Sequence, residues 1–316
     1  MLAALLLGAA AVASRASARP PKPAQEPPVF DGAKAVEIKP AEEPREAAPA
    51  APRARRPYCY NILASGLDNA GGGSDTNLLV RVDSPNKRVD VVSLPRDTLL
   101  HTDRYSNKLN YAYASGGTDR LRSDVERLLG VPVDFCVSVD LQGFIALIDR
   151  IGGVDFDVPA DMDYDDPAQN LHIHYAKGSR HLSGKQAMEV VRWRKNNDGG
   201  GYADADIGRI ATQQAFLKAV AEQALSLRNA PALAQVFFSY VKTDLSAGNL
   251  VWLASEALDI GTDGIYFHTL PGDGTGYYRG ESVYVLDPGG TLALVNEALN
   301  PYDQPITMDE LDVFVP

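Results

Sequence analysis

Two aspartates flank a glycine-rich stretch and could together bind a divalent cation. The chain reads Gly66-Leu-Asp68, then Asn-Ala-Gly-Gly-Gly, then Ser74-Asp75-Thr76. Glycines let the backbone fold back, so the carboxylates of Asp68 and Asp75 can reach one point. Mg²⁺ binds through one or two carboxylates and takes its other oxygens from water and phosphate. The pattern predicts a Mg²⁺ site at Asp68 and Asp75, and an ordinary polar hairpin is the alternative.

An arginine follows a proline at the end of a predicted strand, in the sequence Ser-Leu-Pro95-Arg96-Asp97-Thr. Pro95 fixes φ and cannot donate to a sheet ladder, which turns Arg96 out of the sheet edge. An arginine at the end of an inner strand of an α/β sheet is well placed to bind an anion. Asp97 would orient Arg96, and a purely structural Arg96–Asp97 pair is the alternative.

A third cluster combines arginines with an amide. Arg192 and Arg194 point the same way if their segment is extended, and diverge by about 200° if it is helical. Arg209 and Gln213 are four residues apart and share one face near the start of a predicted helix, where anions bind. The arginine fork bridges phosphate oxygens. These residues predict an anion site, and a solvated charged loop is the alternative.

Strands and helices alternate along the chain and must position these clusters. β-branched and apolar runs predict strands at 60–65, 77–83, 88–94, 133–139, 154–159, 264–269 and 282–286. Apolar periodicity and caps at Thr118, Asp140 and Ser183 predict helices at 118–129, 141–151, 184–193, 206–227, 231–241, 248–258 and 290–299. Pro85-Asn86-Lys87 predicts a hairpin turn. The fold class is α/β: a single domain at 58–316 whose central mixed sheet is flanked by helices on both faces.

Charge excludes one large class of partner. The 316 residues carry a net charge of −11, and residues 58–316 alone carry −14. Nucleic acid requires a basic face, so we expect no nucleic-acid partner. Phosphate chemistry in so acidic a domain must rely on a few local arginines or on a metal.

Cysteine and histidine give weaker signals. Cys59 and Cys136 lie in apolar runs typical of strands, and are interpreted as two buried thiols or, alternatively, one bridge between neighbouring strands. His172 and His174 alternate along one strand face, but the sequence suggests no third metal ligand near them.

The N-terminal region differs from the rest. Residues 1–18 are predicted to form an apolar export segment or a truncated membrane anchor, because their run of 13 apolar residues is too short for a comfortable membrane span. A cytoplasmic N-terminal helix is the alternative. Residues 19–57 carry ten of the 21 prolines and predict a disordered spacer. The domain is therefore expected outside the cytoplasmic membrane, and added protease should cut the spacer in spheroplasts.

The order of the motifs resembles the LytR–CpsA–Psr family of cell-wall glycopolymer transferases. The resemblance covers residues 58–225 well and continues loosely through 242–246 and 270–272. The motifs that carry it are Gly66–Asp68, Ser74–Thr76, Ser93–Thr98, Lys108–Gly117, Leu182–Ala187, Val191–Arg194 and Asp206–Gln214.

The resemblance implies an enzyme on the outer face of the bacterial cytoplasmic membrane. Such an enzyme moves a glycopolymer from a polyprenyl-pyrophosphate carrier to a peptidoglycan hydroxyl. By resemblance, Asp68 and Asp75 match Mg²⁺-associated acids and Asp97 supports Arg96. The residues matching the pyrophosphate-binding set are Arg96, Arg192, Arg194, Arg209 and Gln213.

Two departures from the family pattern reduce the positive charge. Ala70 and Gly73 stand where the family often has arginine, which implies weaker phosphate binding or a different polymer. A hydrolase that acts on the same pyrophosphate lipid, and a non-catalytic wall-binding or regulatory module, are the alternative functions. The lipid chain needs an apolar slot, which stretches 145–151, 215–225 and 251–258 could line, although they could equally be plain core.

Overall fold

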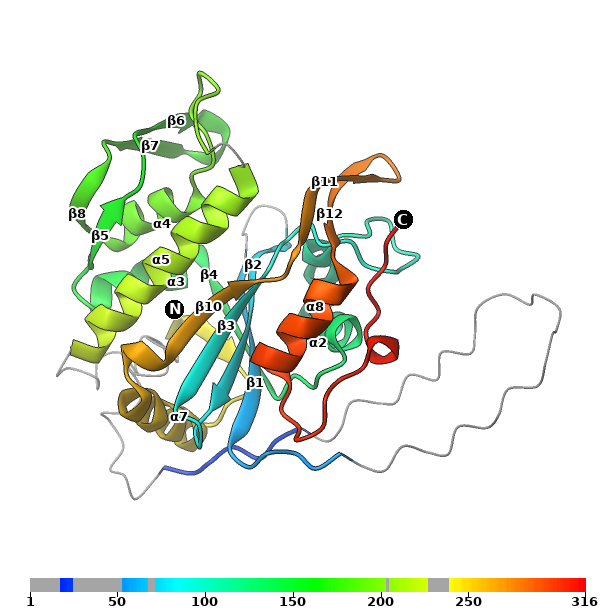
Figure 1. The fold of residues 1–316 in the computed structure, drawn as a ribbon. Coiled ribbons are helices and arrows are strands. Elements are labelled where there is room, and N and C mark those ends of the chain that lie inside the picture. The colour runs from blue at the N-terminus through cyan, green and yellow to red at the C-terminus, as the bar shows by residue number, and fades with distance from the viewer. Residues whose placement is uncertain (1–17, 25–52, 68–71, 203–204, 227–238) are drawn as a thin grey trace.

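Six strands form the central sheet in the order β10-β3-β2-β1-β4-β9 (Figure 1). The structure is a computed structural model and describes residues 18–24, 53–67, 72–202, 205–226 and 239–316. The strands are β1 (Cys59–Leu67), β2 (Ser74–Asp83), β3 (Arg88–Leu94), β4 (Phe135–Asp140), β9 (Val241–Thr243) and β10 (Ile265–Thr269).

The sheet is mixed, as predicted. β1 pairs with β2, β2 with β3 and β4 with β9 in antiparallel fashion, whereas β1–β4 and β3–β10 are parallel. The predicted hairpin turn joins β2 to β3, and the amide of Lys87 donates to the carbonyl of Ser84 at 3.1 Å. β1 and β3 consequently end at the same edge of the sheet, where Leu67 and Leu94 are their last residues.

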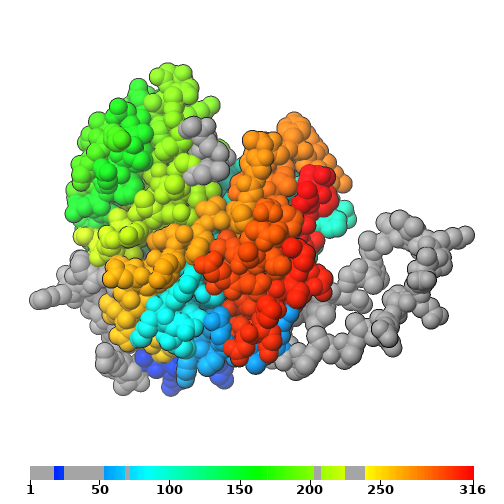
Figure 2. Space-filling model, viewed as in Figure 1, coloured from blue at the N-terminus to red at the C-terminus, as the bar shows by residue number. Residues whose placement is uncertain are grey.

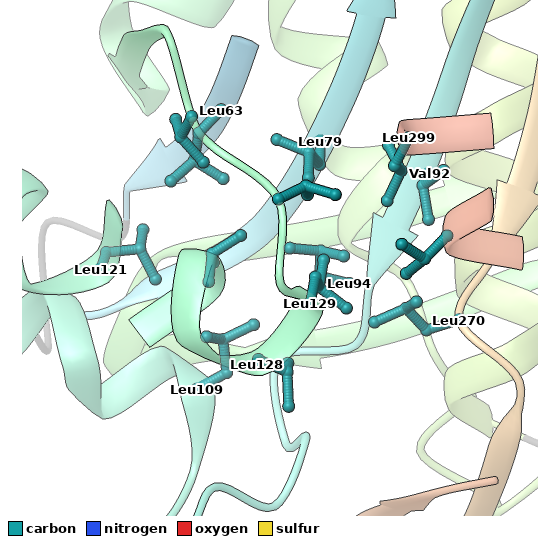
Figure 3. Close-up of a cluster of buried hydrophobic side chains, with 14 of the residues drawn as sticks. Leu63, Leu79, Val92, Leu94, Leu109, Leu121, Leu128, Leu129, Leu270 and Leu299 are labelled. Carbon is teal, nitrogen blue, oxygen red and sulfur yellow. The ribbon is translucent and has the colours of Figure 1, made fainter. Parts of the chain in front are cut away.

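Helices cover both faces of the sheet, which confirms the predicted fold class. On one face, α2 (Leu109–Leu129) and α8 (Pro288–Leu294) enclose the leucine-rich cluster of Figure 3, which includes Leu63, Leu79 and Val92. On the other face, α3 (Leu141–Arg150), α5 (Ala205–Ser226) and α7 (Ala247–Ile260) pack on Ile62 and Val80. Adjacent residues of each inner strand serve opposite cores, which explains their nearly continuous apolar sequences.

Two short two-stranded sheets lie beside the central sheet. β5 (Val154–Val158) pairs with β8 (Gly178–Leu182), and β6 (Met162–Asp166) pairs with β7 (Leu171–Tyr175). Both pairs of strands pack on α3, α4 (Gly184–Arg192) and α5 through a third apolar cluster. The sequence predicted β5 and a strand at the two histidines, but not β6 or β8, because their polar sequences lack the usual strand pattern.

Two of the three predicted helix caps are correct, and the third, Thr118, lies inside a longer helix. Asp140 and Ser183 cap α3 and α4 as predicted. α2 begins nine residues before the predicted Thr118, because the chain is also helical ahead of a break at Gly116 and Gly117. Gly117 has φ 66°, a conformation that favours glycine. Because the two glycines break the helical pattern, the sequence predicted only the part of the helix that follows them.

The C-terminal part adds one hairpin and a closing helix. β11 (Gly272–Tyr278) pairs with β12 (Glu281–Leu286), of which only β12 was predicted, because β11 is rich in glycine. α8 continues into a π-helical turn, Val295–Leu299. The two segments together match the predicted final helix. The helix predicted at 231–241 lies mostly outside the described residues.

Both ends of the predicted spacer contact the domain, contrary to the expectation of disorder through residue 57. The hydroxyl of Tyr60 donates to the carbonyl of Pro21 at 2.8 Å, and the amide of Ala24 donates to Asp134 at 2.8 Å. Arg55 pairs with the same buried Asp134, and Arg56 pairs with the buried Asp83. These buried carboxylates need positive partners, which the arginines after residue 52 supply. Residues 25–52 and the expected export segment at 1–17 lie outside the described residues.

Within the described ranges, no helix combines the length and the apolar character needed to cross a membrane. Cys59 and Cys136 are both buried and unbridged, which confirms the interpretation as buried thiols over a disulfide. Burial raises the pKa of both thiols to about 11, so they are protonated at neutral pH.

Candidate functional site

A cavity of about 600 Å³ opens where β1 and β3 end, between the sheet and helices α3, α4 and α5. Figure 2 shows the green part of the chain rising on one side and the orange hairpin β11–β12 on the other, with a notch between them. The predicted residues that line the cavity are Asp75, Arg96, Arg192, Arg194, Arg209 and Gln213. The structure therefore brings together six residues that the sequence placed in three separate clusters.

Arg96 is placed by a tight turn at the end of β3. The amide and the hydroxyl of Thr98 both donate to the carbonyl of Pro95, at 3.0 and 2.7 Å. The carbonyl of Arg96 accepts from the amide of Asn110 in the first turn of α2, at 2.9 Å. Pro95 thus ends the strand as predicted, and α2 fixes the backbone from which Arg96 enters the cavity.

Asp75 faces Arg96 across the cavity mouth. It lies on β2 rather than in the predicted loop, because β2 begins at Ser74 and pairs with the end of β1. Its Oδ1 accepts from Nη1 of Arg96 at 2.5 Å, with the two side chains 40% and 29% exposed. Asp68 directly follows Leu67 of the cavity wall, but lies outside the described residues.

Asp97 has two basic neighbours. Its Oδ1 lies 3.3 Å from Nζ of Lys108 and 3.7 Å from Nε of Arg96. The second distance is too long for a hydrogen bond, so Asp97 acts on Arg96 through its charge alone. Lys108 is the closer partner, and no sequence signal had suggested this pair.

Arg192 and Arg194 enter the cavity from a helix end. Arg192 is the last residue of α4, and the following Trp193 leaves the helix with φ −61° and ψ 138°. Trp193 is 1% exposed, and its indole donates to Asn196 at 3.1 Å. The buried indole anchors the segment between the two arginines, which both line the cavity. The structure combines the two conformations that the sequence left open, helical before Trp193 and extended after it.

Arg209 and Gln213 lie on α5 and share the face that lines the cavity, as predicted. The amide group of Gln213 donates to the carbonyl of Val191 at 3.1 Å and ties α5 to the end of α4. Gln214 instead donates to Ser93 and to the carbonyl of His268, at 3.0 and 2.8 Å. The adjacent glutamines therefore fix α5 to the helix that carries Arg192 and to the end of the sheet that carries Arg96.

The described lining of the cavity is positive, although the domain as a whole is acidic. Its described ionisable lining residues are Arg96, Arg192, Arg194, Lys195, Arg209, Asp75 and Asp140. Five are basic and two are acidic, and the carboxylate of Asp140 already accepts from the amide of Gly143 as the cap of α3. Lys195 was not among the predicted binding residues, although it directly follows Arg194. The local excess of three positive charges favours a multiply charged anion.

A smaller cavity of about 70 Å³ adjoins the first and extends toward β11 and β12. The two cavities share the same polar residues, among them Asp75, Arg96, Arg209 and Gln213. This group lies at the junction of the two cavities, so an anion bound there would be reached from two directions.

A second part of the lining of the large cavity is apolar. Leu67, Leu78, Phe144, Phe216 and Leu217 are among its side chains. The prediction for stretch 215–225 is confirmed by the two residues of α5. For stretches 145–151 and 251–258 the alternative of plain core holds, because α3 lines the cavity only through residues before 145 and α7 packs into the core on this face of the sheet.

The described part of the site fits Mg²⁺ in its chemistry. Asp75 offers a hard carboxylate oxygen inside the cavity, and Mg²⁺ needs only one or two such ligands when phosphate and water supply the others. Asp68 is the expected second carboxylate, and Mg²⁺ binding remains a proposal.

His172 and His174 do have a third potential ligand, contrary to the sequence analysis. Asp165 of β6 lies beside both histidines, and its ligand atom and theirs lie within 4.8 Å of one another. The sequence could not show this because Asp165 reaches the histidines only through the register of β6 on β7.

Comparison with known proteins identifies relatives over most of the domain. Residues 33–298 match the model of the LytR_cpsA_psr family. A polyisoprenyl-teichoic acid–peptidoglycan teichoic acid transferase TagU of Bacillus mycoides is 31% identical over 67% of this chain and 73% of its own. A transferase of the same description, TagV of Bacillus subtilis, is 34% identical over 54% of this chain, which spans only 45% of that protein.

Solved structures share the fold. The crystal structure of Bacillus subtilis TagV is 26% identical with a TM-score of 0.64, covering 81% of this chain and 98% of that one. Protein gbs0355 of Streptococcus agalactiae is 21% identical with a TM-score of 0.68, covering 81% of this chain and 92% of that one. At 21% identity the second likeness concerns the fold alone.

Proposed function

This chain belongs to the LytR_cpsA_psr family, and we propose that its cavity transfers a glycopolymer from a polyprenyl-pyrophosphate lipid to a hydroxyl of peptidoglycan. The observation that carries the proposal is one cavity that is lined by both a cationic group and an apolar group of side chains. A pyrophosphate lipid has the same two parts, a charged head and a hydrocarbon chain. The names of the TagU and TagV relatives describe a donor and an acceptor of these classes.

Charge determines where the pyrophosphate binds. A doubly substituted pyrophosphate carries about two negative charges, and the described cavity lining has an excess of three positive charges. Arginine forks bind phosphate oxygens in pairs, so Arg96, Arg192, Arg194 and Arg209 hold the head group at the junction of the two cavities. The hydrocarbon chain then occupies the apolar part beside Phe144 and Phe216.

The proposed reaction is a displacement at the polymer-side phosphorus. The oxygen of the acceptor hydroxyl forms a bond to that phosphorus, and the bond from phosphorus to the bridging oxygen breaks. Polyprenyl phosphate leaves with the bond's electron pair, and the hydroxyl proton passes to a carboxylate, for which Asp75 is the described candidate. The arginines stabilise the charge that spreads over the phosphoryl oxygens.

The proposed Mg²⁺ would be held by Asp75 and, as the sequence predicts, Asp68. It would supply additional positive charge to the pyrophosphate. Asp75 has a second role in the described structure, because it holds Arg96 at the cavity mouth. The substrates further imply that the domain works on the outer face of the cytoplasmic membrane, held there by the N-terminal segment.

A transfer assay tests the function. The full chain is incubated with a polyprenyl-pyrophosphate-linked glycopolymer, Mg²⁺ and soluble peptidoglycan strands. We expect polyprenyl phosphate to be released in equal amount to the polymer that becomes linked to peptidoglycan. Release of unlinked polymer phosphate at the same rate with and without peptidoglycan would instead identify a hydrolase and overturn the proposal.

A binding assay tests the metal separately. We expect Mg²⁺ to tighten the binding of a polyprenyl pyrophosphate, and the lipid to tighten the binding of Mg²⁺ by the same factor. Asp75→Ala should remove this coupling while the apolar part still holds the hydrocarbon chain. Equal lipid affinity with and without Mg²⁺ in the unmodified protein would contradict a metal role for the aspartates.

A further inference from the structure

The β6–β7 hairpin, labelled in Figure 1, carries two aspartates and two histidines whose register and alternation place them on one face. In the antiparallel register Asp163 lies opposite His174 and Asp165 lies opposite His172. All four are exposed, whereas the alternate residues, such as Ile173 with 0% exposure, pack into the core. The backbone that carries the four side chains is therefore held from below by a buried face.

Three ligand atoms already converge on this face. Oδ1 of Asp165 lies 2.5 Å from Nδ1 of His172 and 3.3 Å from Nε2 of His174. In a tetrahedral zinc site with bonds of about 2.0–2.2 Å, neighbouring ligand atoms lie about 3.3 Å apart. The second distance already meets this value, and the first needs to widen by less than about 1 Å, which side-chain rotation can provide.

Asp163 completes an arrangement that is typical of metal-binding histidines. Its Oδ1 lies 2.7 Å from Nδ1 of His174 and can accept the proton of that nitrogen, which makes Nε2 the atom available to a metal on the side of Asp165. A metal-ligating histidine usually donates its other ring N–H to a carboxylate, which fixes the tautomer and the ring orientation. A simple ion pair would give His174 one carboxylate. His174 instead lies close to both Asp163 and Asp165, and Asp165 is also close to His172.

We propose that His172 Nδ1, His174 Nε2 and Asp165 Oδ1 bind Zn²⁺, with Asp163 positioning His174 and water in the fourth place. Two imidazoles and a carboxylate suit Zn²⁺, whereas Mg²⁺ takes oxygen ligands. Within the described part of the chain, this is the sole group of three or more such side chains close enough to hold an ion. The site is separate from the Mg²⁺ site proposed in the cavity.

Zinc here would brace a wall of the cavity. Tyr164 and Leu171, on the opposite face of the same hairpin, line the cavity. The amides of Asp163 and Asp165 donate to the side chains of Asn196 and Asn197, at 2.7 and 2.6 Å. A metal that joins β6 to β7 therefore stiffens the strand that holds the segment just after Arg194.

Zinc titration of the untagged full chain, by calorimetry in excess Mg²⁺ and without lipid, tests the site. We expect one equivalent of Zn²⁺ to bind, His174→Ala and Asp165→Asn to abolish binding, and Asp163→Asn to weaken it by about 10–100-fold. Amide hydrogen exchange in β6 should slow when Zn²⁺ is added. Because no lipid is present, the outcome is independent of the proposed transferase function.

His181→Ala is the matched control. His181 is also exposed and lies 2.7 Å from Asp155 across the β5–β8 strand pair, but its Nε2 is within hydrogen-bonding distance of the carbonyl of Gly152, at 2.9 Å. This variant should bind Zn²⁺ like the unmodified protein. The proposal is overturned if the unmodified protein binds no Zn²⁺, or if folded His174→Ala, checked by circular dichroism, binds as tightly as His181→Ala.

Discussion

The two ends of the central sheet use arginine and aspartate in opposite ways. We call the end with the β2–β3 turn the hairpin end, and the end with Leu67 and Pro95 the cavity end. At the hairpin end, arginines pair with aspartates whose side chains are at most 2% exposed. The pairs are Arg55–Asp134, Arg56–Asp83, Arg81–Asp90 and Arg88–Asp90. At the cavity end, the acid that accepts a hydrogen bond from Arg96 is Asp75, which is 40% exposed.

The difference separates a structural ion pair from a binding site by the burial of the acid. A buried carboxylate depends on its arginine, because losing one partner leaves an uncompensated charge in the interior. An exposed carboxylate is solvated with or without its partner, so the arginine can exchange it for an incoming anion. Sequence alone could not distinguish the two cases, since Arg81 and Arg96 both belong to strand-and-turn segments with an aspartate nearby.

The largest expected effect is on stability at the hairpin end. Asp90→Asn leaves Arg81, which is 4% exposed, without its carboxylate, and should lower the free energy of unfolding by about 3–5 kcal/mol. Asp75→Asn is the matched change at the cavity end and should cost less than about 1 kcal/mol. Urea denaturation measures both. Similar losses would mean that burial of the acid does not distinguish the two ends.

The next effect is on activity at the cavity end. Arg96→Lys keeps the charge but loses the two-pronged fork, so transfer activity should fall by about tenfold or more, as expected for charge-assisted bonds of about 1.5–3 kcal/mol. The melting temperature should change little. Arg81→Lys should show the reverse, a lower melting temperature with activity per folded molecule preserved. If Arg96→Lys lowers the melting temperature and spares activity, Arg96 belongs to a structural pair.

The smallest effect is a pH dependence at the hairpin end. Burial by itself raises the pKa of Asp90, but bonds from His268 and Arg88 and the charge of Arg81 outweigh it, so the pKa lies below its usual value. Such a carboxylate stabilises the fold at any pH above its pKa in the unfolded chain, which is about 3.9. This stabilisation is lost as the pH falls through the lower pKa that the carboxylate has in the folded protein. The difference in unfolding free energy between the unmodified protein and Asp90→Asn should therefore hold at neutral pH and shrink below about pH 4. A difference that stays constant on acidification would show that Asp90 is not the titrating group.

The sequence predicted the parts of the molecule that follow from local pattern. Three kinds of feature depend on neighbours in the chain. They are the ends of the strands before Asp68 and Pro95, the caps of α3 and α4, and the helix face that Arg209 and Gln213 share. Features that depend on pairing distant segments were missed.

The missed features share one physical cause. The strand β6 contains three aspartates and is stable only because Met162 and Tyr164 pack below it, and Asp165 meets the histidines only in the β6–β7 register. Lys108 likewise reaches Asp97 only after α2 folds against the end of β3. Register and packing are set by the whole fold, so composition along one segment does not show them.

The contacts of residues 18–24 decide by which end the molecule can be held. This segment meets the domain at Tyr60 and Asp134, where β1 and β4 begin (Figure 1). β1 has nine residues at about 3.3 Å each, so the cavity mouth lies about 30 Å away along the strand. A fluorophore, bead or surface linker attached before residue 18 would therefore hold the protein at the hairpin end, away from the cavity mouth. The cavity mouth would then stay open to large polymers.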